Sequence, residues 1–192
     1  EILIGLVGSE MCIRDRRYSA VMVGAGTVIA DDPMLTCRLE NGRNPIRIIC
    51  DSRLRIPADC NIVKTADKVR TIIACLETAK NAEIYQKYGV EILRTGERDG
   101  RVDLKELVVR LGEMKIDSIL LEGGSELNYS AMKVGIVNKV QAYISPKIFG
   151  GKNAPSPVSG LGVSSPADAF MLHNPSISRF GEDILIEWRT MD

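Results

Sequence analysis

Apolar and polar positions alternate in blocks along the chain, and these blocks predict strands and helices in turn. Short apolar runs with many β-branched residues are typical of buried strands, and we expect them at residues 20–23, 45–51, 70–75, 90–93, 118–121 and 139–145. Helical spacing of apolar residues occurs at 77–88, 103–111 and 125–134. This alternation is typical of an α/β fold with parallel strands and right-handed crossovers.

Both ends of the chain depart from this alternation. Residues 2–7 form an apolar run that suits a strand, and residues 10–17 are mostly charged or polar. A long segment rich in glycine, proline and serine, residues 146–166, precedes two expected strands at 168–172 and 183–188, with a turn at 175–181 between them. Loops of this length inside a compact domain often carry function. The strand-rich ending indicates antiparallel edge strands.

Composition narrows the function classes. The 192 residues are enough for one domain, and lysine plus arginine equals aspartate plus glutamate at 25 each, which argues against a generic nucleic-acid binder. The five cysteines show no C-x-x-C spacing and the chain has a single histidine, so a zinc site has little support. Free thiols and the lack of a membrane-spanning apolar run predict a cytoplasmic protein.

One stretch combines a buried strand with groups that suit a polar ligand. Residues 21–38 read V-M-V-G-A-G-T-V-I-A-D-D-P-M-L-T-C-R. Gly24 and Gly26 allow a sharp turn and a close approach to the main chain. Thr27, the aspartate pair that begins at Asp31, and Arg38 follow. This order indicates a site for a phosphorylated small molecule; the alternative is an ordinary strand-to-helix turn with a solvated acidic cap.

Two more polar stretches follow predicted strands. L-E-G-G-S-E-L-N at 121–128 runs from a strand through two glycines into a helix, whose first amides favour an anion such as pyrophosphate. The alternative is a plain helix start capped by Ser125. Asp51-Ser52-Arg53 suits the extra phosphate of NADP, or is a solvated turn. Ligands of open α/β sheets bind at the carboxyl ends of strands, so the three stretches support one another.

These motifs together resemble a known family. V-G-A-G-T-V-I-A-D-D-P-M-L-T-C-R, I-I-C-D-S, L-L-E-G-G-S-E-L and Y-I-S-P-K-I-F-G-G, over residues 18–188, resemble the reductase domain of the bifunctional riboflavin-biosynthesis deaminase–reductase. The resemblance implies a dihydrofolate-reductase-like three-layer α/β fold, with a mixed, mostly parallel sheet and helices on both faces. It also implies NADPH-dependent reduction of 5-amino-6-(5-phosphoribosylamino)uracil to 5-amino-6-(5-phosphoribitylamino)uracil, with hydride passing to the ribose C1′.

Residue roles follow from the same resemblance. On the cofactor side it places Thr27, Asp31, Ser52, Gly124, Ser125, Glu126, Leu127, Asn128, Tyr129 and Ser130. On the substrate side it places Leu35, Arg38 and Glu122. It names no general acid and no metal ligand. It implies a homodimer and no nucleic-acid or membrane partner, and it implies a deaminase unit whose H-x-E and P-C-x-x-C elements this chain lacks.

The N-terminal segment departs from the family pattern. Nothing before Tyr18 matches the family's first strand with its S-x-D-G-like turn, and G-L-V-G-S-E-M-C-I-R-D-R looks foreign to the family, as a truncation or assembly scar would. We therefore divide the chain into an atypical segment, 1–17, and a reductase domain, 18–192, and expect impaired turnover. Two alternatives remain at this point: a related reductase of another pteridine-like substrate, and a non-catalytic nucleotide-binding remnant.

Overall fold

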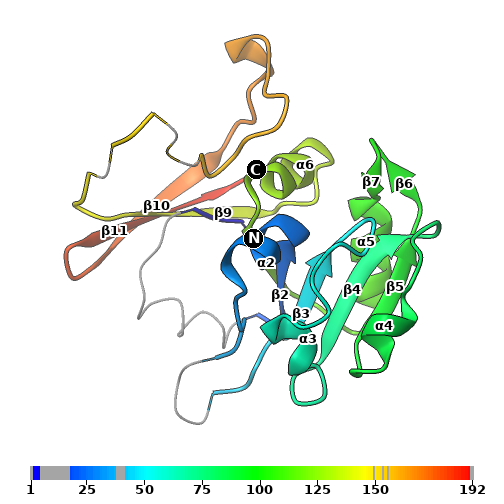
Figure 1. The fold of residues 1–192 in the computed structure, drawn as a ribbon. Coiled ribbons are helices and arrows are strands. Elements are labelled where there is room, and N and C mark those ends of the chain that lie inside the picture. Colours follow the sequence, from blue (N-terminus) through cyan, green and yellow to red (C-terminus); the bar gives the residue numbers. More distant parts are fainter. Residues whose placement is uncertain are drawn as a thin grey trace.

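A nine-stranded sheet forms the centre of the protein in a computed structural model that describes residues 2–4, 18–37, 42–148, 150–152, 154 and 156–190 (Figure 1). The strand order is β10-β11-β9-β1-β8-β2-β3-β4-β5. The strands are β1 (Ile2–Ile4), β2 (Ala20–Gly24), β3 (Ile46–Cys50), β4 (Thr71–Leu76), β5 (Glu91–Thr95), β8 (Ile119–Gly123), β9 (Lys139–Ile144), β10 (His173–Phe180) and β11 (Asp183–Arg189). Seven neighbouring strands, from β9 to β5, are parallel, and β11 and β10 add antiparallel pairs.

Helices cover both faces of this sheet, as expected. The helices are α2 (Ala25–Asp31), α3 (Asn61–Lys64), α4 (Glu83–Gln86), α5 (Leu104–Glu113) and α6 (Ser125–Lys133). Side chains of α5 and α6 belong to one apolar cluster with Ile48 of β3, whereas α2, α3 and α4 join a second cluster with Ile49. Successive strand residues face opposite sides, so β3 supplies both layers. The mixed, mostly parallel α/β sheet with helices on both faces is thereby confirmed.

The central strands are buried because each has a neighbour on both sides and a helical layer above and below. All six residues of β4 are buried, as are Ala20–Val23 within β2. Parallel strands covered on both faces carry continuous apolar runs rather than alternating ones, and this is why the sequence showed them clearly. The carboxyl ends of these strands all lie at the same edge of the sheet.

The first described residues contribute a strand to the interior of the sheet. β1 lies between β8 and β9, with Ile2 opposite Leu121 on one side and Val140 on the other. A strand is thus present within the apolar run 2–7, and the structure describes Ile2–Ile4 of it. Residues 5–17 lie outside the described part of the chain, so the division of the sequence after residue 17 stays an expectation.

Three expectations about local structure are wrong. The helix expected at 77–88 is reduced to α4, because Asn81 adopts a left-handed conformation with φ of 63° that a helix does not allow. The strand expected at 168–172 is instead β10, and the chain turns at Gly181. β10 is a largely exposed edge strand with little apolar pattern, and its pairing with β11 defines it.

The third is an omission from the sequence reading: a two-stranded hairpin of β6 (Glu97–Arg98) and β7 (Arg101–Val102). Asp99 and Gly100 form its turn, both with positive φ, 53° and 76°. An Asp-Gly pair with that geometry is a strong hairpin signal when apolar residues alternate on both sides of it. Here the flanking strands consist mostly of charged residues, so that alternation is missing.

Candidate functional site

Three turns meet at one edge of the sheet. They follow β8, β2 and β3, which are adjacent and parallel, so Gly123, Gly24 and Cys50 end their strands side by side. These are the three stretches that the sequence singled out. The fold therefore brings together segments that lie up to about a hundred residues apart in the chain.

The two glycine turns approach each other closely. A Cβ atom on Gly124 would lie 3.8 Å from the Gly24 Cα, 3.7 Å from the Thr27 Oγ1 and 3.5 Å from the Leu127 Cβ. Gly123 and Gly124 have φ of 151° and 86°, and L side chains rarely adopt either value. The turn after β8 thus places backbone next to backbone, with the Thr27 hydroxyl beside both glycines.

Helix α6 begins at this point without a side-chain cap. Its N-cap is Gly124, and no described side chain hydrogen-bonds to its first amides. The expected alternative, a cap from Ser125, is wrong: the Ser125 Oγ accepts a 2.8 Å hydrogen bond from the Ser159 hydroxyl. Glu126 in the first turn pairs with Arg101 at 2.6 Å. The amides at the start of α6 favour an anion, and the negative charge of Glu126 opposes one. Arg101 offsets that negative charge.

The next residues of α6 mainly hold the long loop that precedes β10. Asn128 is 3% exposed, and its amide donates a 2.9 Å hydrogen bond to the Pro157 carbonyl. The Tyr129 hydroxyl donates to the Gly162 carbonyl at 2.8 Å, and its ring meets Phe170 edge to face. Of the predicted cofactor stretch, Gly124 and Leu127 therefore face the glycine turns, whereas these two side chains face the loop.

An apolar cavity lies between α6, β9 and this loop. It has a volume of about 330 Å³ and is lined by Tyr129, Met132, Val140, Val158, Ser159, Gly162, Val163, Ala169, Phe170 and Leu172. Nearly all of these side chains are apolar, so the cavity does not suit a phosphorylated pyrimidine. The last residue of the predicted cofactor stretch, Ser130, donates its hydroxyl back to the Glu126 carbonyl at 2.8 Å within the helix.

The turn after β3 is held by its own side chains. Asp51 is fully buried, and its Oδ2 accepts hydrogen bonds from the backbone N–H groups of Arg55 (2.5 Å) and Ile56 (2.9 Å). The Tyr85 hydroxyl donates to the carbonyls of Leu54 and Ile56 at 3.0 and 2.7 Å. Burial, together with the charge of Asp51, raises the pKa of Tyr85. Asp51 therefore shapes the turn from inside the fold.

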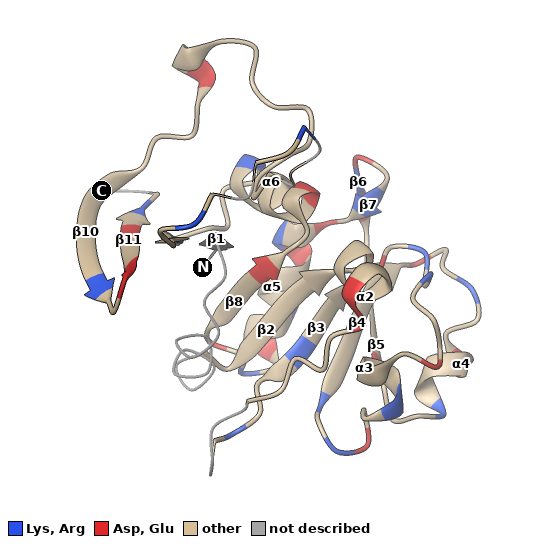
Figure 2. Ribbon diagram, turned by 60° about the vertical axis from the view of Figure 1, so that its left-hand side comes forward, with Lys and Arg blue, Asp and Glu red and all other residues tan. Residues whose placement is uncertain are grey.

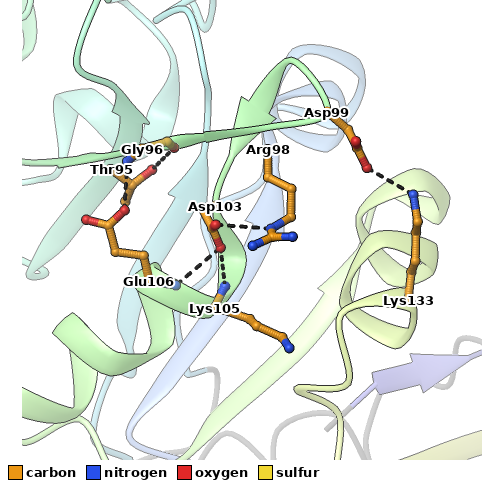
Figure 3. A network of polar contacts seen from close by, with 8 residues as sticks. All are labelled: Thr95, Gly96, Arg98, Asp99, Asp103, Lys105, Glu106 and Lys133. Carbon is orange, nitrogen blue, oxygen red and sulfur yellow. Dashed lines mark hydrogen bonds and ion pairs between the residues drawn. The ribbon is translucent and has the colours of Figure 1, made fainter.

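Ser52 connects this turn to the β6–β7 hairpin. Its Oγ accepts a 3.1 Å hydrogen bond from the Val102 N–H, while the neighbouring Arg53 is exposed. Two ion pairs join the same hairpin to α6. Arg101 pairs with Glu126 near the helix start. Asp99 pairs with Lys133 at 2.9 Å near the helix end, as Figure 3 shows. The hairpin thus bridges the turn after β3 and the start of α6.

The hairpin also leads directly into α5. Asp103 caps that helix by accepting hydrogen bonds from the Lys105 and Glu106 N–H groups, and it pairs with Arg98 at 3.0 Å (Figure 3). These bonds at Asp103 fix the end of the hairpin, which explains why two strands of only two residues each keep a defined position.

Glu122 occupies a bulge in β8. Met22 of β2 pairs with Leu121, and the next residue of β2, Val23, pairs with Gly123, so Glu122 is the extra residue between them. Bulges of this kind re-aim a side chain and are frequent beside active sites. The side chain is partly buried next to the glycine turn.

The remaining predicted residues lie on α2 and the loop after it. Thr27 and Asp31 are four residues apart on the same helix and share one face. Leu35 follows in the loop with φ of 47° and packs against the second apolar cluster. Arg38 lies outside the described residues.

The described residues offer few other groups that could bind a metal or react as a nucleophile. They contain no group of three or more histidine, cysteine or acidic residues placed to hold a metal, and no helix of sufficient length and apolarity to span a membrane. Burial, with the neighbouring Asp51 charge, raises the pKa of Cys50 to about 12, so this thiol at the sheet edge stays protonated at neutral pH.

Comparisons with known proteins agree with this geometry. Riboflavin biosynthesis protein RibD of Actinobacillus pleuropneumoniae is 49% identical over 173 residues, which are 90% of this chain and 46% of that protein. The 2,5-diamino-6-ribosylamino-4(3H)-pyrimidinone 5′-phosphate reductase of Methanothermobacter thermautotrophicus is 38% identical, covering 90% of this chain and 80% of that protein. The chain thus spans just under half of the first relative.

A solved structure and a family model complete the comparison. The diaminohydroxyphosphoribosylaminopyrimidine deaminase/5-amino-6-(5-phosphoribosylamino)uracil reductase of Thermotoga maritima superposes with a TM-score of 0.67 at 29% identity, covering 94% of this chain and 47% of that one. The RibD C-terminal domain model matches residues 10–186. Because this match covers most of its length, the chain belongs to the RibD C-terminal domain family.

Proposed function

We propose that this protein is an NADPH-dependent reductase that converts 5-amino-6-(5-phosphoribosylamino)uracil to 5-amino-6-(5-phosphoribitylamino)uracil in riboflavin biosynthesis. One observation carries the proposal: the glycine turns after β2 and β8 meet beside the Thr27 hydroxyl, at the uncapped start of α6. Such an arrangement gives a phosphorylated cofactor close access to backbone amides. The membership of the chain in a family of reductases supports it.

The residues present fit a nicotinamide dinucleotide. A side chain on Gly124 would occupy the space beside Thr27 and Gly24, so glycine keeps that space open. The amides that begin α6 suit the pyrophosphate, and Thr27 and Asp31 offer polar groups on one face of α2. Ser52 and the exposed Arg53 suit the 2′-phosphate of NADPH. When bound, NADPH supplies the hydride for the reduction.

The substrate side uses groups around the bulge and the loop after α2. Glu122 suits hydrogen bonds from the ribose or the pyrimidine, since a carboxylate accepts from several donors. Arg38 suits bidentate binding of the substrate phosphate. Leu35, in the loop after α2, offers an apolar contact. Together these residues orient the substrate toward the cofactor turn, and orientation is the protein's main contribution in a cofactor-dependent reduction.

The test is a turnover assay with purified protein. NADPH is mixed with the phosphoribosylaminouracil, and the absorbance of the reduced nicotinamide is followed. We expect substrate-dependent loss of this absorbance, and Arg38→Ala should raise the KM for the pyrimidine far more than the Kd for NADPH. Binding of NADPH without any substrate-dependent oxidation would contradict the proposed reaction and favour a nucleotide-binding remnant.

A second substrate is suggested by one relative. The archaeal reductase that is 38% identical is named for a diaminopyrimidinone 5′-phosphate, which carries an amino group where the uracil carries an oxygen. Assays with both pyrimidines and with dihydrofolate decide among the candidate substrates. A higher kcat/KM for the diaminopyrimidinone would replace the uracil in the proposal, and turnover of dihydrofolate alone would favour the pteridine-like alternative.

Partners and the N-terminal segment belong to the same proposal. We infer a cytoplasmic homodimer that works with a deaminase unit, since the Thermotoga relative is named for both activities. We also infer that residues 1–17 are atypical of the family and impair turnover, because they lack the S-x-D-G-like turn expected after the first strand, although the family model matches from residue 10 onward. Replacing residues 5–17 with a family-like segment should raise both melting temperature and turnover, and unchanged values would contradict this inference.

A further inference from the structure

Arg47 is a charged residue inside the apolar layer on one face of the sheet. It lies in β3 between Ile46 and Ile48 and has 0% of its surface exposed. In Figure 2, β3 carries a blue, basic segment, whereas most of the neighbouring central strands are drawn as uncharged. Its neighbour on the same face of the strand, Ile49, is a core residue of the second apolar cluster. An aliphatic side chain would therefore suit the packing at this position.

The guanidinium is fully engaged by hydrogen bonds. Nε donates to the Thr71 hydroxyl at 2.9 Å, and Nη2 donates to the carbonyls of Thr65 and Val69 at 3.0 and 2.9 Å. Nη1 donates to the Thr65 hydroxyl at 2.8 Å and to the Met34 carbonyl at 3.2 Å. Four of the five bonds reach the segment from α3 to β4, and the fifth reaches the loop after α2.

That fifth bond is one of three hydrogen-bonded anchors of the loop after α2. At the start of the loop, the Asp32 Oδ1 accepts from the Asn61 N–H at 2.8 Å and the Asp32 carbonyl accepts from the Asn61 side chain at 3.0 Å. Farther along, the Cys37 N–H donates to the Asn44 Oδ1 at 3.0 Å, so the Met34 bond is the anchor between them. Leu35, which follows Met34 directly, holds φ of 47°, an unfavourable value for leucine. The surrounding bonds must maintain this conformation, and the Met34 bond is adjacent to it.

Burying a guanidinium costs desolvation free energy. Hydrogen bonds offset this cost only where several buried acceptors lie within reach of the one side chain. Burial lowers the pKa of Arg47 to about 10, and the side chain stays cationic at neutral pH. Its planar fork reaches the segment from α3 to β4 and the loop after α2 at once, which a lysine or an aliphatic residue cannot do with five hydrogen bonds. The loop that this fork reaches carries Leu35 and leads to Arg38, both assigned above to the substrate side.

We propose that Arg47 is a positioning residue for substrate binding, because it fixes the backbone of the loop after α2 through the Met34 carbonyl. The inference rests on the proposed function, which assigns this loop to the substrate. Arg47 touches neither ligand directly; it acts by setting where Leu35 and the following residues lie. Replacing Arg47 should therefore raise the KM for the pyrimidine and leave the Kd for NADPH unchanged.

The experiment compares Arg47→Met with Thr71→Val. Both remove an Arg47 hydrogen bond, but Thr71→Val leaves the Met34 bond intact and so controls for lost stability. We expect Arg47→Met to raise the KM for the pyrimidine at least tenfold, to keep the Kd for NADPH within twofold, and to speed amide exchange at residues 32–37 at least tenfold. Thr71→Val should lower the melting temperature and change none of these three quantities.

Two results would overturn the inference. One is an Arg47→Met protein with unchanged KM and unchanged exchange in the loop; the other is a Thr71→Val protein that shows the same changes as Arg47→Met. If Arg47→Met does not fold, Arg47→Lys serves in its place, with the same pattern at about threefold. If the unmutated protein binds NADPH but reduces no pyrimidine, the proposed function fails, and the exchange comparison still decides whether Arg47 fixes the loop.

Discussion

The turn after β3 and the glycine turns after β2 and β8 lie side by side, yet they are held in opposite ways. After β3, the Asp51 carboxylate and the Tyr85 hydroxyl satisfy the backbone groups of the turn from inside the fold. After β2 and β8, glycines bring two backbones into contact, and no described side chain caps the helix that follows.

This difference distinguishes a structural turn from a ligand-binding turn. Backbone groups in a folded protein need hydrogen-bond partners, so a turn that supplies its own has no need of a ligand. A turn whose amides are left open at a helix start, with side chains kept away, has the composition of an anion site. Ser52 belongs clearly to neither kind of turn. It follows Asp51 in the self-satisfied turn, but its hydroxyl contacts the β6–β7 hairpin outside that turn.

The largest expected effect is on stability, at Asp51. Asp51→Ala leaves the buried N–H groups of Arg55 and Ile56 without their acceptor, which should lower the free energy of unfolding by about 3 kcal/mol. Urea unfolding measures this loss. The Kd for NADPH, measured at low temperature where the variant is folded, should stay within threefold. A large loss of affinity with little loss of stability would show that the Asp51 carboxylate binds the ligand instead of shaping the turn.

The next effect is on cofactor affinity, at Gly124. Gly124→Ala forces a side chain into a left-handed conformation and places a Cβ beside Thr27 and Gly24, so we expect the Kd for NADPH to rise about tenfold, or roughly 1.4 kcal/mol. Gly135→Ala is the matched control, since Gly135 has φ of 72° with nothing within 4 Å of the added atom. Similar melting temperatures with different affinities would support the site. Equal affinities for the two variants would argue against it.

A smaller effect is expected on cofactor preference, at Arg53. NADPH should be preferred over NADH, and Arg53→Ala should reduce that preference about fivefold, because one exposed charge-assisted contact to the 2′-phosphate is worth roughly 1 kcal/mol. Titration of both cofactors measures the ratio. Equal affinity for NADPH and NADH in the unmutated protein would contradict the assignment of the turn after β3 to the 2′-phosphate.

The smallest effect is expected at the two ion pairs between the hairpin and α6. Glu126→Gln removes a carboxylate beside the helix start and should strengthen NADPH binding about twofold at low salt, an advantage that added salt should abolish. Asp99→Asn breaks the pair with Lys133 near the other end of the helix and should leave the affinity unchanged. Equal effects from both variants would mean that the ion pairs act only by holding the hairpin.

The sequence alone was sufficient for the central sheet, and it placed the candidate site at the carboxyl ends of three of its strands. Residues 20–23, 70–75 and 118–121 could be identified as strands because burial on both faces demands unbroken apolar runs. The glycines at 123 and 124 marked a turn that only glycine tolerates, and strand order in α/β folds places such turns at one edge. The family motifs then supplied roles for individual residues.

Only the tertiary structure decided which of those residues face the site. Gly24 and Gly124 are a hundred residues apart, and their contact depends on β2 pairing with β8. Ser125 and Tyr129 are fixed by the long loop, and Arg47 is anchored to Met34, through contacts that no local pattern encodes. Periodicity reports whether a residue is buried, whereas hydrogen-bond partners are set by how distant segments pack, and this is why the sequence predicted the strands and turns of the candidate site but not the contacts that hold them.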